Sequence, residues 1–180
     1  MKIVLLLTFL FGITLADTKG QMLRLFQNKE YEKACNLGYD TYKENKRDEE
    51  FISLYAFSCL YSDYIDRLSA PASLLKLTPE SRANSAYFAV IVMQKKLLYH
   101  ALLDGYKLSN FKLPSTDYIL SKVFDLYVKA KKNKRNIYIF KDPDDSKITY
   151  KLYLRDDYKI KKMVIEEYYD TIAVKSHEYW

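Results

Sequence analysis

The pattern of hydrophobic and polar positions has a helical period over the first two thirds of the chain and a period of two near its end. Apolar residues recur at helical spacing in 31–42 and again in 52–59. From Ile148 to Arg155 apolar and polar residues alternate, which predicts a half-buried strand. We therefore expect an α+β fold: mainly antiparallel helical hairpins, as a short superhelix or bundle, followed by a small C-terminal antiparallel β-sheet.

The clearest expected helix has a start signal and a stop signal. Thr78 is a good N-cap, and Pro79 is favoured at the first helical position. Gly105 is a typical residue just beyond a helix end. Between these signals the segment Ala86–Met93 is apolar on all sides, which predicts that it is surrounded by other elements.

The remaining elements follow from the same patterns. Shorter helices are expected at 21–28, 30–45 and 49–62, after a break at Pro71, and after Pro114. Strands are expected at 137–140, 148–155 and 159–169, with turns at 142–145 and 156–157. Residues 171–180 either add a fourth strand or trail away from the sheet.

The N-terminus resembles a secretory signal peptide. Lys2 precedes an apolar run over 3–15, and Thr14 and Ala16 are small residues at the two positions that are read for cleavage. The run is shorter than the ~18 residues of a membrane-spanning helix, so an uncleaved anchor is the lesser alternative. We expect a signal peptide at 1–16, a helical domain at 17–132 and a sheet at 133–180, packed on the helices. The exported protein would be periplasmic or secreted, with no transmembrane segment.

The two cysteines, Cys35 and Cys59, lie twelve residues on either side of Arg47, where two expected helices are joined. In an antiparallel helix pair such positions lie at nearly the same height, and both fall on apolar stripes. A disulfide is therefore geometrically feasible in an oxidising compartment. Two buried free thiols are the alternative.

The segment Asn28–Ala34 resembles the turn and second-helix start of a tetratricopeptide repeat, with Tyr31 and Ala34 at the matching positions. A second Tyr, Tyr64, follows after nearly one repeat, although Arg67 stands where the family has a small residue. The resemblance covers residues 21–77. It implies antiparallel helix pairs stacked as a short superhelix that binds a peptide or a protein.

Charge adds one candidate site. The formal net charge is +6, which is too small and too dispersed to argue for nucleic-acid binding. Five cations are concentrated where the last helix gives way to the sheet: Lys129, Lys131, Lys132, Lys134 and Arg135. This basic segment is either a cationic helix end or a contact for an anionic partner, such as lipid or a cell-wall polymer.

Catalytic and cofactor motifs are absent from the sequence. His100 and His177 are the only histidines, no second His follows at zinc-binding spacing, and the four glycines form no phosphate loop. We expect no cofactor and no metal site. The sequence thus predicts a non-enzymatic interaction module of a bacterial cell envelope, binding a partner protein through helical hairpins or the sheet face. Attachment to an anionic envelope surface through the basic segment is one alternative. An enzyme without a recognisable motif, with a pocket at His100, is another.

Overall fold

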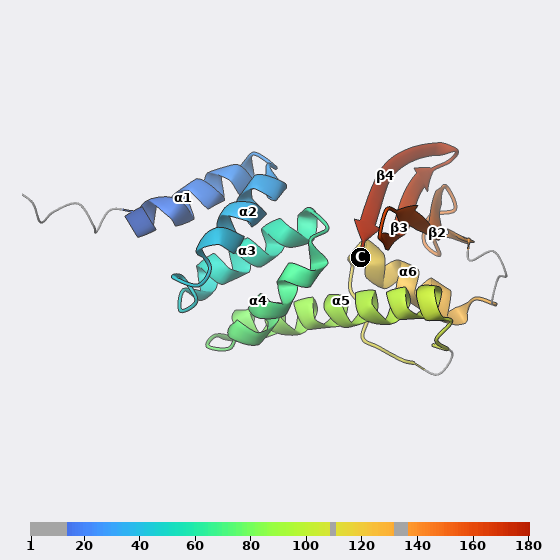
Figure 1. Ribbon diagram of the computed structural model, residues 1–180, viewed down its shortest axis with the longest axis horizontal. Helices are drawn as coiled ribbons and strands as arrows, with labels where there is room; N and C mark the ends of the chain where they lie inside the picture. Colours follow the sequence, from blue (N-terminus) through green and yellow to red (C-terminus); the bar gives the residue numbers. More distant parts are fainter. Residues whose placement is uncertain (1–13, 109–110, 132–136) are drawn as a thin grey trace, which may run out of the picture. The chain divides into compact units, whose positions relative to one another are not determined.

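The computed structural model describes residues 14–108, 111–131 and 137–180. These residues form six α-helices, a short 3-10 helix and a four-stranded sheet, which confirms the α+β class (Figure 1). The chain divides into two compact units, Met1–Ser62 and Asp63–Trp180, here called unit 1 and unit 2. The division lies before the fourth helix, whereas the sequence places it at 132/133, where the hydrophobic period changes.

Unit 1 is a three-helix unit of α1 (Thr14–Gln27), α2 (Tyr31–Thr41) and α3 (Glu49–Tyr61). The helix α1 begins earlier than the expected start at residue 21. Asp48 caps α3, because its carboxylate accepts a hydrogen bond of 3.0 Å from the main-chain N–H of Phe51. The predicted signal cleavage after Ala16 stays a prediction, since residues 1–13 lie outside the described part of the chain.

Unit 2 begins with the 3-10 helix η1 (Ile65–Leu68) and continues with α4 (Ser69–Leu74), α5 (Pro79–Asp104) and α6 (Ile119–Lys129). The side-chain oxygen of Thr78 accepts from the main-chain N–H of Ser81 at the start of α5. Gly105 ends the helix with a φ of 72°, a left-handed conformation that a side chain disfavours. Both predicted ends of this helix are confirmed.

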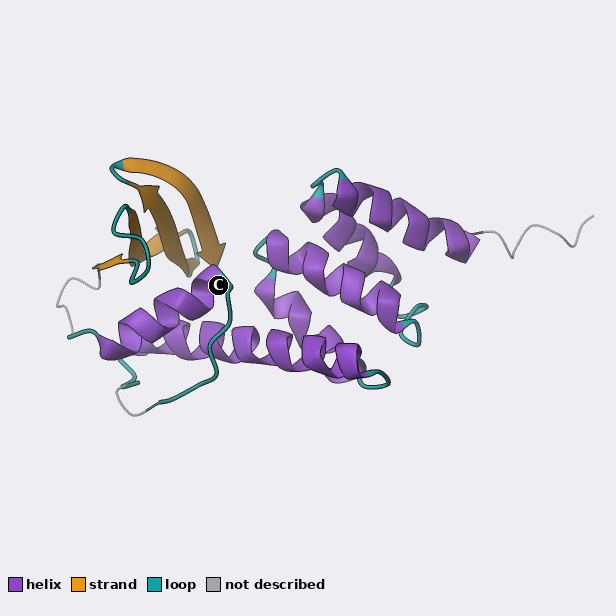
Figure 2. Ribbon diagram, turned by 180° about the vertical axis from the view of Figure 1, so that it is seen from behind, coloured by secondary structure: helices purple, strands orange, loops and turns teal. Residues whose placement is uncertain are grey.

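The sheet is an antiparallel meander with strands in sequence order. Its strands are β1 (Tyr138–Lys141), β2 (Ile148–Asp157), β3 (Ile160–Tyr169) and β4 (Ile172–Tyr179). Residues left open by the sequence therefore form a fourth strand. The helices α5 and α6 contact one face of the sheet (Figures 1 and 2). The register pairs Leu152 with Ile165 and Ile165 with His177, so these three side chains form a row on the buried face.

One expectation about α5 is wrong. Phe88, Ile91 and Leu98 are buried, but Ala86 and Ala89 are exposed and Met93 is 53% exposed. The segment Ala86–Met93 is apolar on all sides, yet only the face of α5 at helical spacing through Phe88, Ile91 and Leu98 is covered by the core of unit 2. The opposite face remains partly uncovered, although the sequence predicts burial on all sides.

Candidate functional site

The cysteine pair is the first candidate that the structure resolves. Cys35 on α2 and Cys59 on α3 are fully buried and joined by a disulfide, with their Cα atoms 4.7 Å apart. The predicted disulfide is confirmed, and the alternative of two free thiols is wrong. The bond links the two helices inside unit 1 and has a structural role.

The basic segment is only partly described. Lys129 ends α6 and Lys131 follows it, both exposed, while Lys132, Lys134 and Arg135 lie outside the described residues. Attachment to an anionic surface through this segment therefore stays a prediction.

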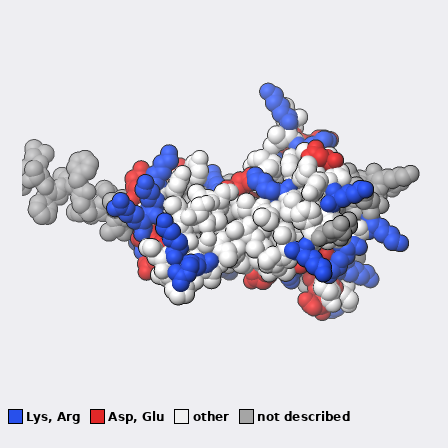
Figure 3. All heavy atoms as spheres, turned by 90° about the horizontal axis from the view of Figure 1, so that it is seen from below, with Lys and Arg blue, Asp and Glu red and all other residues white. Residues whose placement is uncertain are grey.

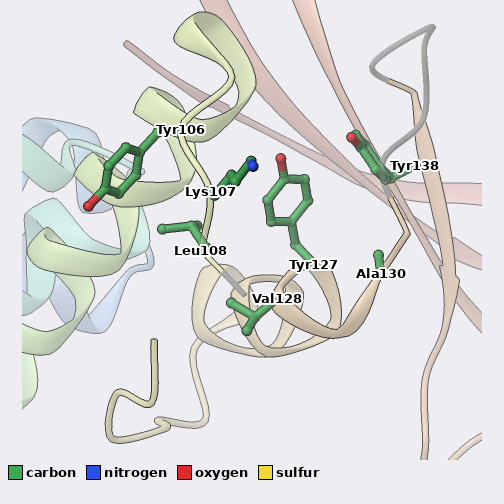
Figure 4. Close-up of a pocket in the computed structure, with 7 residues that line it drawn as sticks. All are labelled: Tyr106, Lys107, Leu108, Tyr127, Val128, Ala130 and Tyr138. Atoms are coloured by element: carbon green, nitrogen blue, oxygen red, sulfur yellow. The ribbon is translucent and has the colours of Figure 1, made fainter. Parts of the chain in front are cut away.

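A hollow of about 240 Å³ lies beside the end of α6. It is lined by Tyr106, Lys107, Leu108, Tyr127, Val128, Ala130 and Tyr138. Figure 4 shows Tyr127 rising from α6 between Lys107 and Tyr138. The rings of Tyr127 and Tyr138 meet edge to face with centroids 4.9 Å apart, and Tyr106 is the third aromatic residue of the lining. Burial, together with Tyr138, raises the pKa of Tyr127, which keeps its hydroxyl neutral at physiological pH.

A buried polar cluster of unit 2 surrounds His177 on β4. The residue is 1% exposed, and its Nδ1 lies 2.8 Å from Oδ1 of Asp63, which precedes η1. Its Nε2 lies 2.9 Å from Oε1 of Glu167 on β3. The hydroxyl of Tyr118 donates to Asp63 at 2.5 Å, and the hydroxyl of Tyr179 does so at 3.4 Å.

These contacts determine the protonation of the cluster. Burial lowers the pKa of His177, but the hydrogen bonds to Asp63 and Glu167 outweigh it, and the pKa is raised. In the charged form both ring nitrogens donate, one to each carboxylate. Burial and Asp63 also hold the pKa of the Tyr118 hydroxyl well above its ordinary value. With both nitrogens engaged, His177 has no free position for proton transfer to a substrate.

A hollow of about 390 Å³ borders this cluster. It is lined by Asp63, Tyr64, Ile65, Asp66, Arg67, Lys95, Tyr179 and Trp180. The ammonium of Lys95, on α5, donates to Oδ2 of Asp66 at 2.8 Å and to the main-chain oxygen of Trp180. Burial lowers the pKa of Lys95, and the contact with Asp66 opposes this effect. Lys96 lies 2.7 Å from the other oxygen of Asp66, so one carboxylate is shared by two cations.

A third hollow, of about 460 Å³ and mostly apolar, lies between α4 and α5. We call it the α4–α5 groove, and it is lined by Ser69, Ala72, Ala89, Val92, Met93, Lys96 and Leu97. Figure 3 shows an uncharged surface over the side of the molecule where α5 lies. Ala72 and Ala89 contribute only methyl groups to the lining, and Lys96 is its one cation. The arrangement can accept an apolar segment but carries no reactive group.

The alternative of a pocket at His100 is wrong. His100 is on the surface, with half of its side chain exposed, and its Nδ1 lies 2.8 Å from Asp104 one turn further along α5. In the described part of the chain, no group of three or more His, Cys, Asp or Glu residues could hold a metal ion. Across the same residues, every helix is too short or too polar to cross a membrane.

Sequence reasoning missed Asp63, Lys95 and Glu167. Lys95 could have been found, because it falls at helical spacing between Ile91 and Leu98 on a buried face. Asp63 could not, because it lies 114 residues from His177 and no local pattern joins them.

Comparisons with known proteins found no matching family model, no matching curated protein and no matching solved structure. The resemblance to tetratricopeptide repeats over residues 21–77 stays a prediction.

Proposed function

We propose that this chain is an exported, non-enzymatic protein-binding module of a cell envelope, and that its α4–α5 groove binds an amphipathic helix of a partner protein. The observation that carries the proposal is an apolar groove on a long helix whose opposite face already forms the core of unit 2. Exposed apolar surface of this kind is typical of interaction sites. The buried disulfide is consistent with export to an oxidising compartment.

The shape of the groove favours a helix as its occupant. Ala89, Met93 and Leu97 follow one another at four-residue spacing and span about 12 Å along α5. An apolar stripe of about two turns on a partner helix has the same length. The alanines allow a close approach of that helix, and the flexible side chain of Met93 adapts to the shape of its residues.

Charge specifies one end of the occupant. Lys96, which shares the carboxylate of Asp66 with Lys95, makes one end of the groove cationic. A Glu or Asp of the partner helix would complement this charge. The partner is therefore an amphipathic helix with an apolar stripe and an acidic residue at one end of that stripe.

The polar clusters support binding rather than catalysis. The two nitrogens of His177 are bound by carboxylates, and the ammonium of Lys95 is held by Asp66 and a main-chain oxygen. A general acid or base needs a free position facing a substrate, which these groups do not offer in this arrangement.

The test combines crosslinking with measured affinity. A photoreactive amino acid replaces Met93 in the native host, and the crosslinked segment of the captured protein is mapped and synthesised. We expect this peptide to bind the purified chain, to be helical when bound, and to bind Ala89→Arg at least about tenfold more weakly, since the Arg side chain occupies space in the groove. The matched control, Ala83→Arg, changes an exposed alanine of α5 that does not line the groove.

The outcome of this comparison decides the proposal. Equal weakening by the two Arg variants, or no weakening by either, would place the partner elsewhere on the chain. A peptide that binds in an extended conformation would also overturn it. Trp180 emission, which reports on unit 2, verifies that both variants are folded.

A further inference from the structure

Three segments of unit 2 that are far apart in the sequence meet at one imidazole. His177 belongs to β4, Glu167 to the neighbouring strand β3, and Asp63 to the turn before η1. The bond from His177 to Asp63 connects the sheet to the start of the helical part of unit 2. We call Asp63, Glu167 and His177 the His177 latch.

The latch is complete only when His177 is charged. The imidazolium has two N–H groups, and it donates one to Asp63 at 2.8 Å and the other to Glu167 at 2.9 Å. Neutral imidazole has one N–H, so its second nitrogen would present a lone pair to a carboxylate oxygen at the same distance. Because both atoms are then acceptors, one of the two contacts is lost.

The other charged and titratable groups around the latch are known from the structure. The hydroxyls of Tyr118 and Tyr179 face Asp63, and burial raises the pKa of both well above the ordinary tyrosine value, so they remain neutral. Lys175, on β4, opposes the charge on His177. Lys95 and Asp66 border the same hollow and pair with each other. The ring of His177 is the group of this cluster that changes charge near neutral pH.

We propose that protonation of His177 operates a latch that ties the C-terminal half of β4 to both Asp63 and Glu167, and that one of these two ties is released as the pH rises. The release loosens the end of β4, where Tyr179 and Trp180 follow His177 in the chain and line the hollow of about 390 Å³. The proposal concerns this hollow and this strand, and it stands independently of the α4–α5 groove.

The direction of the pH response follows from the contacts. Burial alone lowers the pKa of His177, yet its two carboxylate partners raise it above the ordinary value. The charged, closed form therefore persists through the ordinary titration range of histidine, about pH 6.5, and is lost as the pH passes the raised pKa.

The chain carries a reporter at the right place. Trp180 is the only tryptophan, it follows Tyr179 at the end of β4, and the ammonium of Lys162 lies 4.9 Å from its ring centre. Its emission is measured from about pH 6 to about pH 9, together with the NMR titration of the His177 ring. We expect one step in Trp180 emission whose midpoint coincides with the His177 titration.

Two variants and a control test the assignment. Glu167→Gln removes one carboxylate and keeps the shape, so we expect the midpoint to move to lower pH. His177→Gln removes the step. His100→Gln replaces the only other histidine, which is paired with Asp104 on the surface of α5, and we expect it to leave the step unchanged.

The proposal fails if Trp180 emission does not change while His177 titrates in the wild-type protein, or if Glu167→Gln leaves the midpoint in place. A step that disappears in His100→Gln would assign the pH response to the other histidine. The wild-type comparison and Glu167→Gln keep the test decisive even if His177→Gln does not fold.

Discussion

At the scale of single residues, unit 2 buries the basic side chains of Lys95 and His177 and pairs each with carboxylates from other elements. Lys95 bonds to Asp66, and His177 bonds to Asp63 and Glu167. Burial of a charge without a partner is strongly unfavourable, so these pairs restrict where η1, α5, β3 and β4 can lie relative to one another within unit 2. Local sequence patterns give no sign of such pairs.

A buried glycine supplies a residue-scale prediction in unit 1. A Cβ atom added to Gly38 would lie 2.5 Å from Cδ2 and 2.9 Å from Cβ of Tyr55. Tyr55 is 1% exposed and cannot move aside freely, so we expect Gly38→Ala to lower the free energy of unfolding by about 1–3 kcal/mol. Urea denaturation followed by far-UV circular dichroism measures this change.

The matched control is the other glycine in a helix of unit 1. The nearest atom to a Cβ at Gly20 is Nη1 of Arg24, at 3.7 Å, so the added methyl group meets no obstacle. Gly20→Ala should raise stability by about 0.5–1 kcal/mol, because alanine loses less backbone freedom on folding. Equal effects of the two substitutions on stability would show that Tyr55 does not exclude a methyl group at position 38.

At the scale of elements, the sequence predicts α5 from end to end but leaves the fourth strand of the sheet open. Thr78, Pro79 and Gly105 specify the helix ends through local hydrogen bonding and backbone geometry. The strand β4 lacks an alternating pattern because residues 172–176 are exposed on both faces and are held by main-chain pairing with β3. The α4–α5 groove could not be predicted either. A helix segment that is apolar on all sides indicates burial, and it gives no sign of which side of the helix stays uncovered.

The N-cap of α5 gives the element-scale prediction. The Thr78 side chain accepts a 3.0 Å hydrogen bond from the Ser81 N–H, which would otherwise lack a partner within the helix. We expect Thr78→Ala to lower the free energy of unfolding of unit 2 by about 1 kcal/mol and Thr78→Ser to have little effect. Urea titration of Trp180 emission measures both. Ser73→Ala, which removes an exposed hydroxyl from α4, should change stability by less than about 0.5 kcal/mol, and a similar loss there would argue against a capping effect.

At the scale of the whole molecule, composition and periodicity predict the fold class but not the division into units. The change of period near 132 marks where helices give way to strands, and it carries no information about which helices pack on the sheet. The choice of helices that pack on the sheet depends on contacts such as the one between His177 and Asp63, which are 114 residues apart in the sequence. The structure groups η1 and α4 to α6 with the sheet in unit 2 and leaves three helices in unit 1.

The disulfide tests whether the two units have separate stabilities. The bond joins residues 24 apart, both in unit 1, while the single tryptophan is in unit 2. In the chain-entropy model, closing a loop of this size contributes about 3–4 kcal/mol. We therefore expect reduction, or a Cys35→Ala/Cys59→Ala double variant, to make unit 1 susceptible to proteolysis at far lower urea concentrations.

Trp180 emission provides the internal control for this experiment. Because each unit has its own buried core, the urea midpoint of Trp180 emission should stay unchanged when the disulfide is removed. Proteolysis fragments identified by mass spectrometry should then begin near residue 63 and extend to the C-terminal end. The opposite outcome is a urea midpoint of Trp180 emission that falls together with the resistance of unit 1 to the protease. It would show that the two units unfold as one cooperative structure and that the disulfide stabilises the whole chain.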